Sequence, residues 1–341
     1  MQSIREPQAP VRPQALQINA PEGRPRPASL SCVIPCHNEA RNLDLLLPQL
    51  ANLLPRLADR WEVILVDDGS TDRTAVVMRD WSELDGFRSV ELSRNFGKEA
   101  ALTAGLEAAD GQVVIMMDAD LQHPPALVAE MVARWREGAD VVYAQRTTRA
   151  DESLFKRAGT KLFYQLLNRA DRFQVPAGAG DFRLMDRRAV DALLSLPERN
   201  RFMKGLYAWI GFDAVALPYA PPPRAHGRTT FSAARLLGLS LDGLTAFHNW
   251  PLRVVGPVGS LLALLSFAYG GDLVVDYLLY GHPVSGWTTI VVLLTFFFGA
   301  QMIFLGIIGE YLARVFEEVK GRPLYLVKRQ SGQGLRPEAR E

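Results

Sequence analysis

Hydrophobic residues in the first half of the chain form short runs that alternate with helical patterns. Runs typical of buried strands cover residues 30–35, 61–66, 89–92, 113–117 and 140–144. Between them, helical spacing continues to about residue 57 and recurs at 74–84, 99–109 and 126–137, with Asp72 suited to cap the second of these helices. This alternation predicts parallel βαβ units and therefore an α/β fold class.

The apolar residues are densest near the C-terminus, in two segments of membrane length. They cover about residues 254–279 and 287–312, and each exceeds the roughly 20 residues that cross a bilayer. The turn at 280–287 lacks Lys and Arg, whereas basic residues flank the outer ends of the pair: Arg253, Arg314, Lys320, Arg322, Lys328 and Arg329. The positive-inside rule predicts a multi-pass protein of the plasma (inner) membrane, with its α/β domain and C-terminus in the cytoplasm.

These patterns divide the chain into five parts. We expect a disordered leader rich in Pro, Gln and Arg at 1–28, an α/β catalytic domain at 29–230, two transmembrane helices at 251–316 and a cytoplasmic tail at 317–341. Residues 231–250 predict an amphipathic juxtamembrane helix that lies along the bilayer or packs on the domain.

Composition excludes several classes of protein. The 341 residues are 48% hydrophobic and carry a net charge of +1, which argues against a nucleic-acid partner. Cys32 and Cys36 are the two cysteines and support neither a disulfide framework nor a metal cluster. The sequence has no Gly-x-Gly-x-x-Gly after its first strand and no Walker lysine motif, which argues against a dinucleotide dehydrogenase or a P-loop enzyme.

Acidic side chains follow two of the predicted strands. Asp118 and Asp120 end the run that begins at Val113, and in a strand they point to the same side, where both could bind one hard divalent cation with ligand phosphates. Asp67 and Asp68 end an earlier strand and could accept hydrogen bonds from a base or ribose. A metal-binding acidic pair beside a membrane predicts transfer from a nucleotide donor to a lipid acceptor.

A second group of charged residues follows the predicted sheet. Residues 180–183 present Asp181 and Arg183 in what we expect to be a Gly-rich loop. Scattered cations could bind phosphate, anchor to anionic lipid headgroups or be ordinary solvated residues: Lys156, Arg157, Arg201, Lys204, Arg224 and Arg228.

Six blocks, in order, resemble those of family 2 glycosyltransferases that act on polyprenyl phosphate. They are Cys-Val-Ile-Pro-Cys-His-Asn-Glu at 32–39, Val-Asp-Asp-Gly-Ser-Thr-Asp at 66–72, Ser-Arg-Asn-Phe-Gly-Lys-Glu at 93–99, Asp-Ala-Asp-Leu-Gln-His-Pro-Pro at 118–125, Gly-Asp-Phe-Arg-Leu at 180–184, and Ile-Ile-Gly-Glu-Tyr-Leu at 307–312 leading to Gly-Arg-Pro-Leu-Tyr at 321–325. The bactoprenol glucosyltransferases and aminoarabinose transferases are the most similar branch, and dolichol-phosphate mannose synthases are more distant.

This resemblance implies a GT-A fold, a Mg²⁺ or Mn²⁺ ion, a nucleotide-sugar donor and inversion at the anomeric carbon. It assigns the metal and donor diphosphate to Asp118, Asp120 and Gln122. The nucleotide pocket would also include Pro35, Asn38, Glu39, Asp67, Asp68 and Lys98. Glucose from UDP-glucose is the first choice of donor, ahead of N-acetylglucosamine, mannose and 4-amino-4-deoxyarabinose donors.

The resemblance places Asp181 at the position of the catalytic acid. It also assigns a catalytic role to the metal-binding Asp120. The acceptor phosphate has a second pKa of about 6 and hardly needs a general base. Asp181 could therefore orient the sugar or support oxocarbenium charge while Arg183 grips a phosphate, or the two could form an internal salt bridge. Acceptor contacts are assigned to Arg183, Lys156, Arg157, Arg201 and Arg228.

Two departures from the family pattern bear on acceptor geometry and sugar preference: the long leader and the segment His-Gly-Arg-Thr-Thr at 226–230. A processive polysaccharide synthase is the alternative enzyme, but Arg134-Trp135 lacks a glutamine three residues before the arginine. A scaffold or lipid-translocation subunit is the alternative from another class. Gly299, Gly306 and Gly309 would permit close helix packing in a homo-oligomer.

Overall fold

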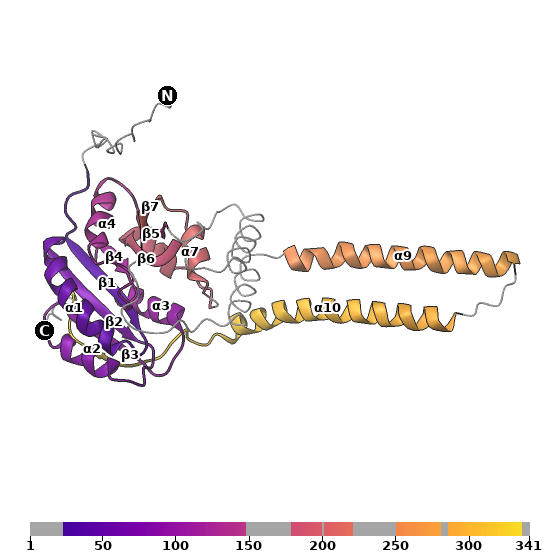
Figure 1. The fold of residues 1–341 in the computed structure, drawn as a ribbon, viewed down its shortest axis with the longest axis horizontal. Coiled ribbons are helices and arrows are strands. Elements are labelled where there is room, and N and C mark those ends of the chain that lie inside the picture. Colours follow the sequence, from indigo (N-terminus) through magenta and orange to yellow (C-terminus); the bar gives the residue numbers. More distant parts are fainter. Residues whose placement is uncertain (1–22, 148–178, 200, 221–249, 281–285, 336–341) are drawn as a thin grey trace, which may run out of the picture.

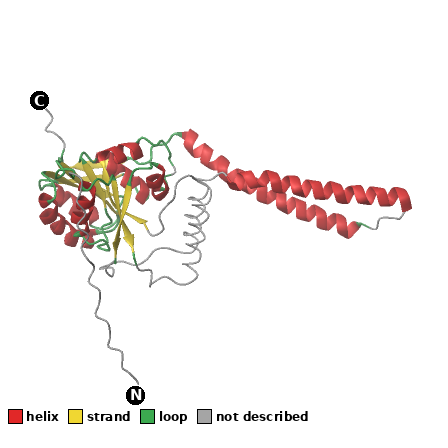
Figure 2. Ribbon diagram, turned by 90° about the horizontal axis from the view of Figure 1, so that it is seen from above, coloured by secondary structure: helices red, strands yellow, loops and turns green. Residues whose placement is uncertain are grey.

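The protein consists of an α/β domain from which two long helices project side by side (Figures 1 and 2). The computed structural model describes residues 23–147, 179–199, 201–220, 250–280 and 286–335. The juxtamembrane segment 231–249 and the predicted phosphate contacts Lys156, Arg157 and Arg228 lie outside these residues, as does the segment 226–230.

Within the described residues, an eight-stranded sheet forms the centre of the domain, in the order β7-β5-β6-β4-β1-β2-β3-β8. The five predicted strands are all present: β1 (Ser29–Cys36), β2 (Arg60–Asp67), β3 (Phe87–Leu92), β4 (Val113–Met116) and β5 (Val141–Arg146). Strands β1 to β4 are mutually parallel. Three further strands extend the sheet: β6 (Ala179–Asp186), β7 (Ala214–Tyr219) and β8 (Val327–Ser331). The parallel order places the carboxyl ends of β1, β2 and β4 at one edge.

Helices cover both faces of this sheet, as a buried parallel sheet requires (Figure 2). One core cluster joins the sheet to α1 (Ala40–Leu53), α2 (Thr74–Ser82) and α4 (Leu127–Arg136). A second cluster joins the opposite face to α3 (Lys98–Ala108), α6 (Arg187–Leu194) and α7 (Met203–Trp209). The predicted helix that continues to residue 57 ends instead in the 3₁₀ turn η1 (Leu54–Arg56).

The prediction of a Gly-rich loop at residues 180–183 is wrong, because these residues belong to β6. This strand runs antiparallel between β4 and β5, with Arg183 opposite both Met116 and Tyr143. Phe182 and Leu184 are fully buried. The polar residues lie in the first half of β6, which extends beyond the end of β4 and pairs with β4 only from Arg183 onward. The first half of β6 therefore lacks an apolar pattern.

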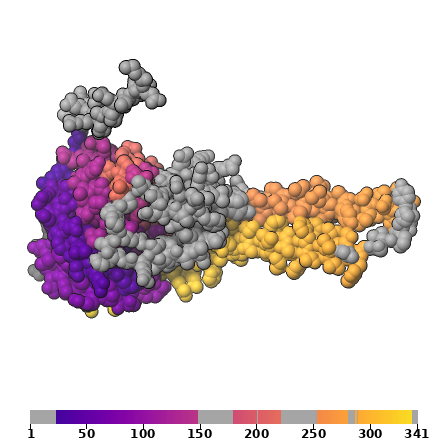
Figure 3. Space-filling view, in the orientation of Figure 1, coloured from indigo at the N-terminus to yellow at the C-terminus, as the bar shows by residue number. Residues whose placement is uncertain are grey.

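Two apolar helices, α9 (Trp250–Tyr280) and α10 (Trp287–Lys320), form the projecting hairpin. Their membrane-length stretches are Val254–Leu279 and Thr289–Lys320, with mean hydropathies of 1.7 and 2.4, and neither stretch is buried within the protein. The hairpin extends away from the domain in the space-filling view (Figure 3). Helix α10 continues eight residues beyond the predicted span and ends at Gly321, whose φ of 67° suits glycine.

The chain after α10 returns to the domain and pairs with its sheet (Figure 1). Strand β8 runs antiparallel to β3, and the amide of Ser93 donates to the carbonyl of Leu326. Further along, Leu335 is anchored at the buried Glu62, whose Oε2 accepts from its amide at 2.9 Å. Residues 327–335 of the predicted tail are therefore part of the folded domain.

The end of the predicted leader also contacts the domain. Arg24 donates to Oδ1 of Asp140 at 2.9 Å, and its guanidinium lies over the ring of Trp135 at 5.2 Å. Residues 1–22 of the predicted leader lie outside the described part of the chain.

Candidate active site

The predicted acidic residues gather at the carboxyl edge of the parallel strands. Asp67 is the last residue of β2, Asp68 follows it, and Asp118 lies two residues beyond β4. Strands β2 and β4 flank β1 and run parallel to it, so their carboxyl ends lie at the same edge of the sheet. Such an edge is where open α/β sheets bind ligands.

Asn38 links two loops at this edge of the sheet. Its backbone is left-handed, with φ of 59°, a conformation that asparagine tolerates better than most residues. Its Oδ1 accepts from the amides of Thr71 at 2.8 Å and Asp72 at 3.3 Å. The next residue, Glu39, is half-buried, and burial raises its pKa, with Asp120 and Asp118 acting in the same direction.

Asp67 and Asp68 bind backbone amides of their own surroundings. Oδ1 of Asp67 accepts from the Ser70 amide at 3.0 Å. The two oxygens of Asp68 accept from the amides of Phe96 at 2.7 Å and Gly97 at 2.9 Å. Asp68 therefore holds the loop that leads into α3 against the edge of the sheet. Pro35 lies half-buried near the end of β1.

This loop approaches the turn after β2 very closely. Gly69 has φ of 65°, and a Cβ atom placed there would lie 2.5 Å from the carbonyl carbon of Arg94. Only glycine fits both the conformation and this contact, so the Asp-Asp-Gly-Ser turn is built to pack against the loop before α3.

Lys98 forms ion pairs with two carboxylates of the site, one after β4 and one in β6. Its Nζ lies 2.6 Å from Oδ1 of Asp118 and 2.8 Å from Oδ2 of Asp181. Burial would lower the pKa of Lys98, but these carboxylates outweigh it and raise that pKa. Burial would likewise raise the pKa of Asp181, but Lys98 and Lys204 lower it to about 2. Asp181 is therefore an anion at neutral pH.

The prediction that Asp118 and Asp120 extend from a strand is wrong. Strand β4 ends at Met116, and the residues after it form a turn in which Leu121 has φ of 59°. Oδ1 of Asp120 accepts from the amide of Gln122 at 3.1 Å. Turn geometry, not strand alternation, therefore sets the directions of the two carboxylates.

The oxygen atoms of this turn suit a hard divalent cation. The charges of Asp118 and Asp120 both act to raise the pKa of Glu39 and that of His123. Among the described residues no three His, Cys, Asp or Glu side chains form a complete metal site. The residues fit a cation that takes part of its coordination from the phosphates of a ligand.

His123 and Arg146 support this turn from the other side. The ring of His123 is 5% exposed and packs 4.7 Å from that of Phe182 on β6. Burial lowers the pKa of His123. Arg146, the last residue of β5, donates to Oε1 of Gln122 at 2.9 Å. Both contacts fix the turn that bears the acidic pair.

The predicted phosphate contacts Arg183 and Arg201 are buried, at 4% and 8% exposure. The guanidinium of Arg183 lies 3.3 Å over the ring of Tyr207 and donates to the carbonyl of Gly180 at 2.7 Å. Asp181 pairs with Lys98 instead of forming the salt bridge with Arg183 that was one alternative. Arg201 donates to the carbonyl of Leu196 at 2.7 Å.

Two neighbours of the site, Arg146 and Glu99, were not predicted from the sequence. Arg146 ends a strand whose carboxyl end faces the same edge as those of β1 and β4, so strand direction could have identified it. Glu99 lies next to Lys98 in a quoted block, but its proximity to Asp181 depends on β6, which the sequence pattern did not reveal.

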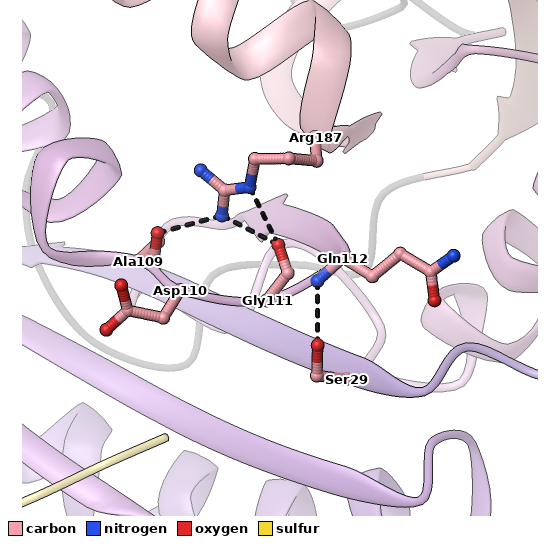
Figure 4. A pocket seen from close by; sticks show the side chains of 6 residues that line it. All are labelled: Ser29, Ala109, Asp110, Gly111, Gln112 and Arg187. Atoms are coloured by element: carbon pink, nitrogen blue, oxygen red, sulfur yellow. Dashed lines mark hydrogen bonds between the residues drawn. The ribbon is translucent and has the colours of Figure 1, made fainter. Parts of the chain in front are cut away.

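A shallow hollow lies at the other end of the strands (Figure 4). Arg187 donates there to the carbonyls of Ala109 and Gly111. The amide of Gln112 donates to Oγ of Ser29 at 2.9 Å. These groups are satisfied by one another and join β1, α3 and α6, so the hollow is structural.

The covered sheet, the acidic carboxyl edge and the apolar hairpin define an α/β domain joined to two helices long and apolar enough to cross a membrane. Residues 31–194 match the family described as Glycosyl transferase family 2. An uncharacterised glycosyltransferase of Synechocystis sp. is 46% identical over 299 residues, which are 87% of this chain and 94% of that protein. The chain belongs to glycosyl transferase family 2.

A further relative and one solved structure show lower similarity to this chain. A prophage-derived bactoprenol glucosyl transferase of Shigella flexneri is 36% identical over 88% of this chain and 97% of that protein. Glucosyl-3-phosphoglycerate synthase of Mycobacterium tuberculosis, solved with Mn²⁺, UDP and phosphoglyceric acid, has a TM-score of 0.46 at 22% identity, over 64% of this chain and 76% of that one.

The predictions of family, fold class and enzyme class are confirmed. The protein is a glycosyltransferase with a GT-A-like mixed α/β domain followed by two apolar helices that fit a membrane hairpin.

Proposed function

We propose that the protein transfers a sugar, with inversion, from a nucleotide sugar to polyprenyl phosphate at the cytoplasmic face of the plasma membrane. Glucose from UDP-glucose and an undecaprenyl acceptor are the first choices, and the name of the Shigella relative, a bactoprenol glucosyl transferase, supports both the sugar and the lipid. The observation that carries the proposal is the contact of Lys98 with both Asp118 and Asp181, on a chain that also bears a membrane hairpin.

In this proposal the donor lies across the carboxyl edge of the sheet. Its nucleotide contacts the loops formed by Pro35, Asn38, Glu39, Asp67 and Asp68, which the bonds of Asn38 and Asp68 hold rigid. Asp118, Asp120 and Gln122 would hold Mg²⁺ or Mn²⁺ together with the diphosphate. When bound, the ion neutralises the charge of the leaving diphosphate. Lys98 supplies a second positive charge at the same place.

Asp181 acts on the sugar. A phosphate oxygen of the acceptor forms a bond to the anomeric carbon as the bond from that carbon to the donor diphosphate breaks. The acceptor phosphate is largely a dianion near neutral pH and does not have to lose a proton first. The anionic Asp181 orients the sugar and stabilises positive charge that develops on the ring.

The acceptor phosphate needs cations between the site and the membrane. We propose Lys156, Arg157, Arg201 and Arg228 for this role. Arg183 instead holds the start of β6 through its bond to the carbonyl of Gly180. Contacts between the domain and the hairpin support an acceptor that reaches the site from the hairpin side. Arg199 donates from its amide to Glu318 at 2.9 Å and from its side chain to the carbonyl of Arg322.

A radiolabelled transfer assay tests the function. Purified full-length protein in detergent is given undecaprenyl phosphate, Mg²⁺ or Mn²⁺ and a panel of nucleotide sugars. We expect one donor to yield a product extractable into organic solvent, with inversion confirmed by NMR. Asp120→Asn should abolish this product, whereas Asp110→Asn, the same change at the opposite end of the sheet, should not. Folded protein that makes no lipid-linked product from any donor would favour a scaffold or translocation role.

A further inference from the structure

The junction between α10 and the catalytic domain contains a glycine at which the chain could bend. Helix α10 ends at Lys320, and Gly321 has φ of 67°. The chain next joins the sheet at Leu326, whose carbonyl accepts from the amide of Ser93 at 2.8 Å. The link between these points is the five residues 321–325, which could extend about 17 Å if they were free. Other contacts must therefore set the angle between the hairpin and the domain.

Arg199 contacts the chain on both sides of this glycine. Its amide donates to Oε1 of Glu318, in the last turn of α10, at 2.9 Å. Its guanidinium donates to the carbonyl of Arg322, the first residue after Gly321. Arg199 itself lies in the catalytic domain, between α6 and α7. One residue of the domain thus holds both the end of the membrane helix and the segment that follows it.

A second contact joins the same link to α3. The hydroxyl of Tyr325 donates to Oε2 of Glu107, in the last turn of α3, and the Tyr325 side chain packs against the second core cluster. The first residue of α3 is Lys98, which pairs with Asp118 and Asp181. One helix therefore contacts the link to the hairpin at its end and carries a cation of the candidate site at its start.

The value of these contacts is geometric. The bonds of Arg199 and of Tyr325 are exposed, and an exposed hydrogen bond contributes little net stability because water competes for both partners. A phosphate on a membrane lipid stays at the level of the headgroups, and the reacting atoms must meet within a few ångströms. The domain must therefore present its acidic edge at one height and one angle above the bilayer.

We propose that Arg199 and Glu318 form a brace that fixes the angle between α10 and the catalytic domain, with Tyr325 and Glu107 as a second point of attachment. Arg199 is a positioning residue: it acts by placing the acidic edge where it can reach a phosphate in the bilayer. The inference rests on the proposed function for the membrane acceptor, but the fixed angle exists whether or not the protein transfers sugar.

The variant Arg199→Ala/Glu318→Ala removes the guanidinium donor and the acceptor of the Arg199 amide. In reconstituted vesicles we expect its KM for undecaprenyl phosphate to rise about tenfold, because the edge no longer stays aligned with the lipid phosphate. The KM for the sugar nucleotide and the rate of transfer to a short-chain prenyl phosphate added in solution should not change, because neither depends on the angle of the domain above the bilayer.

Two further variants separate the brace from general damage. Arg199→Lys/Glu318→Gln keeps a donor and an acceptor and should behave like the wild type. Arg56→Ala/Glu317→Ala makes the same pair of changes at an exposed arginine of η1 and at the residue before Glu318, and it should also leave every substrate unaffected. If Arg199→Ala/Glu318→Ala is unstable, Glu318→Ala alone, at an exposed position of α10, gives the same comparison.

Double electron–electron resonance measures the angle without any transferase activity. Spin labels are placed at Glu83→Cys, exposed at the end of α2, and at Thr289→Cys, exposed near the far end of the hairpin. The protein is diluted with unlabelled copies in lipid nanodiscs. We expect one narrow distance distribution for the wild-type junction and a clearly broader one for Arg199→Ala/Glu318→Ala. Adding Tyr325→Phe should broaden it further.

Equal widths for the wild-type junction and for Arg199→Ala/Glu318→Ala would overturn the inference. So would an equal loss of transfer to the bilayer acceptor and to the short-chain acceptor, since a misplaced domain affects only the former. If neither protein transfers sugar while the distribution broadens as expected, the proposed function fails and the brace stands.

Discussion

Lys98 and Asp118 meet at 2.6 Å between Nζ and Oδ1, although one begins a helix and the other follows a strand on the same sheet. The Lys98 side chain is 43% exposed, so solvent and ligands reach the contact. Exposed ion pairs contribute little to folding stability. The value of this pair therefore lies in presenting positive charge at the acidic edge, where a diphosphate would need it.

Replacing Lys98 tests this interpretation. Lys98→Met should lower kcat/KM for the sugar nucleotide by about 100-fold, because a fixed charge that stabilises the leaving group is lost. The unfolding free energy should fall by about 3 kcal/mol, because the Asp181 carboxylate, whose side chain is 14% exposed, would lose its paired cation. Steady-state kinetics and denaturant titration measure the two quantities. Lys328→Met, on the exposed strand β8, is the matched control. Normal kinetics in Lys98→Met would exclude a role for this lysine at the diphosphate.

Metal removal should abolish transfer reversibly. We expect EDTA to stop the reaction and added Mg²⁺ or Mn²⁺ to restore it. Electron paramagnetic resonance of Mn²⁺ with UDP should detect binding to the wild type and to Asp110→Asn, with much weaker binding to Asp118→Asn and Asp120→Asn. Equal binding by all four proteins would place the cation elsewhere.

Asn38 should affect stability and donor binding separately. Asn38→Ala loses the bonds to Thr71 and Asp72 and must adopt φ of 59° without an asparagine side chain, at a cost of about 2 kcal/mol. Asn38→Gly loses the same bonds but tolerates the backbone, so it should recover about 1 kcal/mol. Denaturant unfolding measures these costs. Both variants should raise the Kd for UDP, and equal stability of the two would show that the backbone is unstrained.

The sequence predicted the strands that contain short hydrophobic runs or an alternating pattern. Strands β1 to β5 were found for this reason, whereas the polar start of β6 concealed that strand. Strand β8, Val-Lys-Arg-Gln-Ser, has no strand pattern because it is an edge strand that pairs by its backbone.

In the site, too, residues within short motifs were predicted, whereas contacts between residues far apart in the chain were not. Adjacent acids such as Asp67 and Asp68 were identified from their position after a strand. The contacts of Lys98 with Asp181 and of Gln122 with Arg146 join residues far apart in the chain. They depend on the placement of β6 and β5, so no short motif could have predicted them.

Membrane orientation can be tested with single cysteines. Gly286 lies at the far end of the hairpin and Glu317 at the end nearest the domain, and the native Cys32 and Cys36 are free but buried. A membrane-impermeant maleimide applied to intact cells should label Gly286→Cys but not Glu317→Cys. Lysed cells should permit labelling of both. The reverse pattern in intact cells would place the domain outside the cytoplasm.

The segment after α10 should stabilise the catalytic domain as well as link it to the hairpin. Leu335 is 6% exposed, its amide donates to Oε2 of the buried Glu62, and its carbonyl accepts from Arg60 at 2.9 Å. Oε1 of Glu62 accepts from Ser31 at 2.5 Å and from the amide of Asp110 at 3.1 Å. Removing Leu335 would leave one oxygen of a fully buried carboxylate without its donor.

A chain that ends at Ser331 keeps β8 but loses this anchor. We expect its unfolding free energy to fall by about 2–4 kcal/mol, from the orphaned Glu62 oxygen, the lost bond of Arg60 and the lost burial of Leu335. A chain that ends at Leu335 keeps every one of these contacts and should unfold like the full-length protein. Denaturant unfolding followed by tryptophan fluorescence measures both. Equal stability of the two truncated chains would mean that residues 332–335 and their anchor at Glu62 contribute nothing to the stability of the fold.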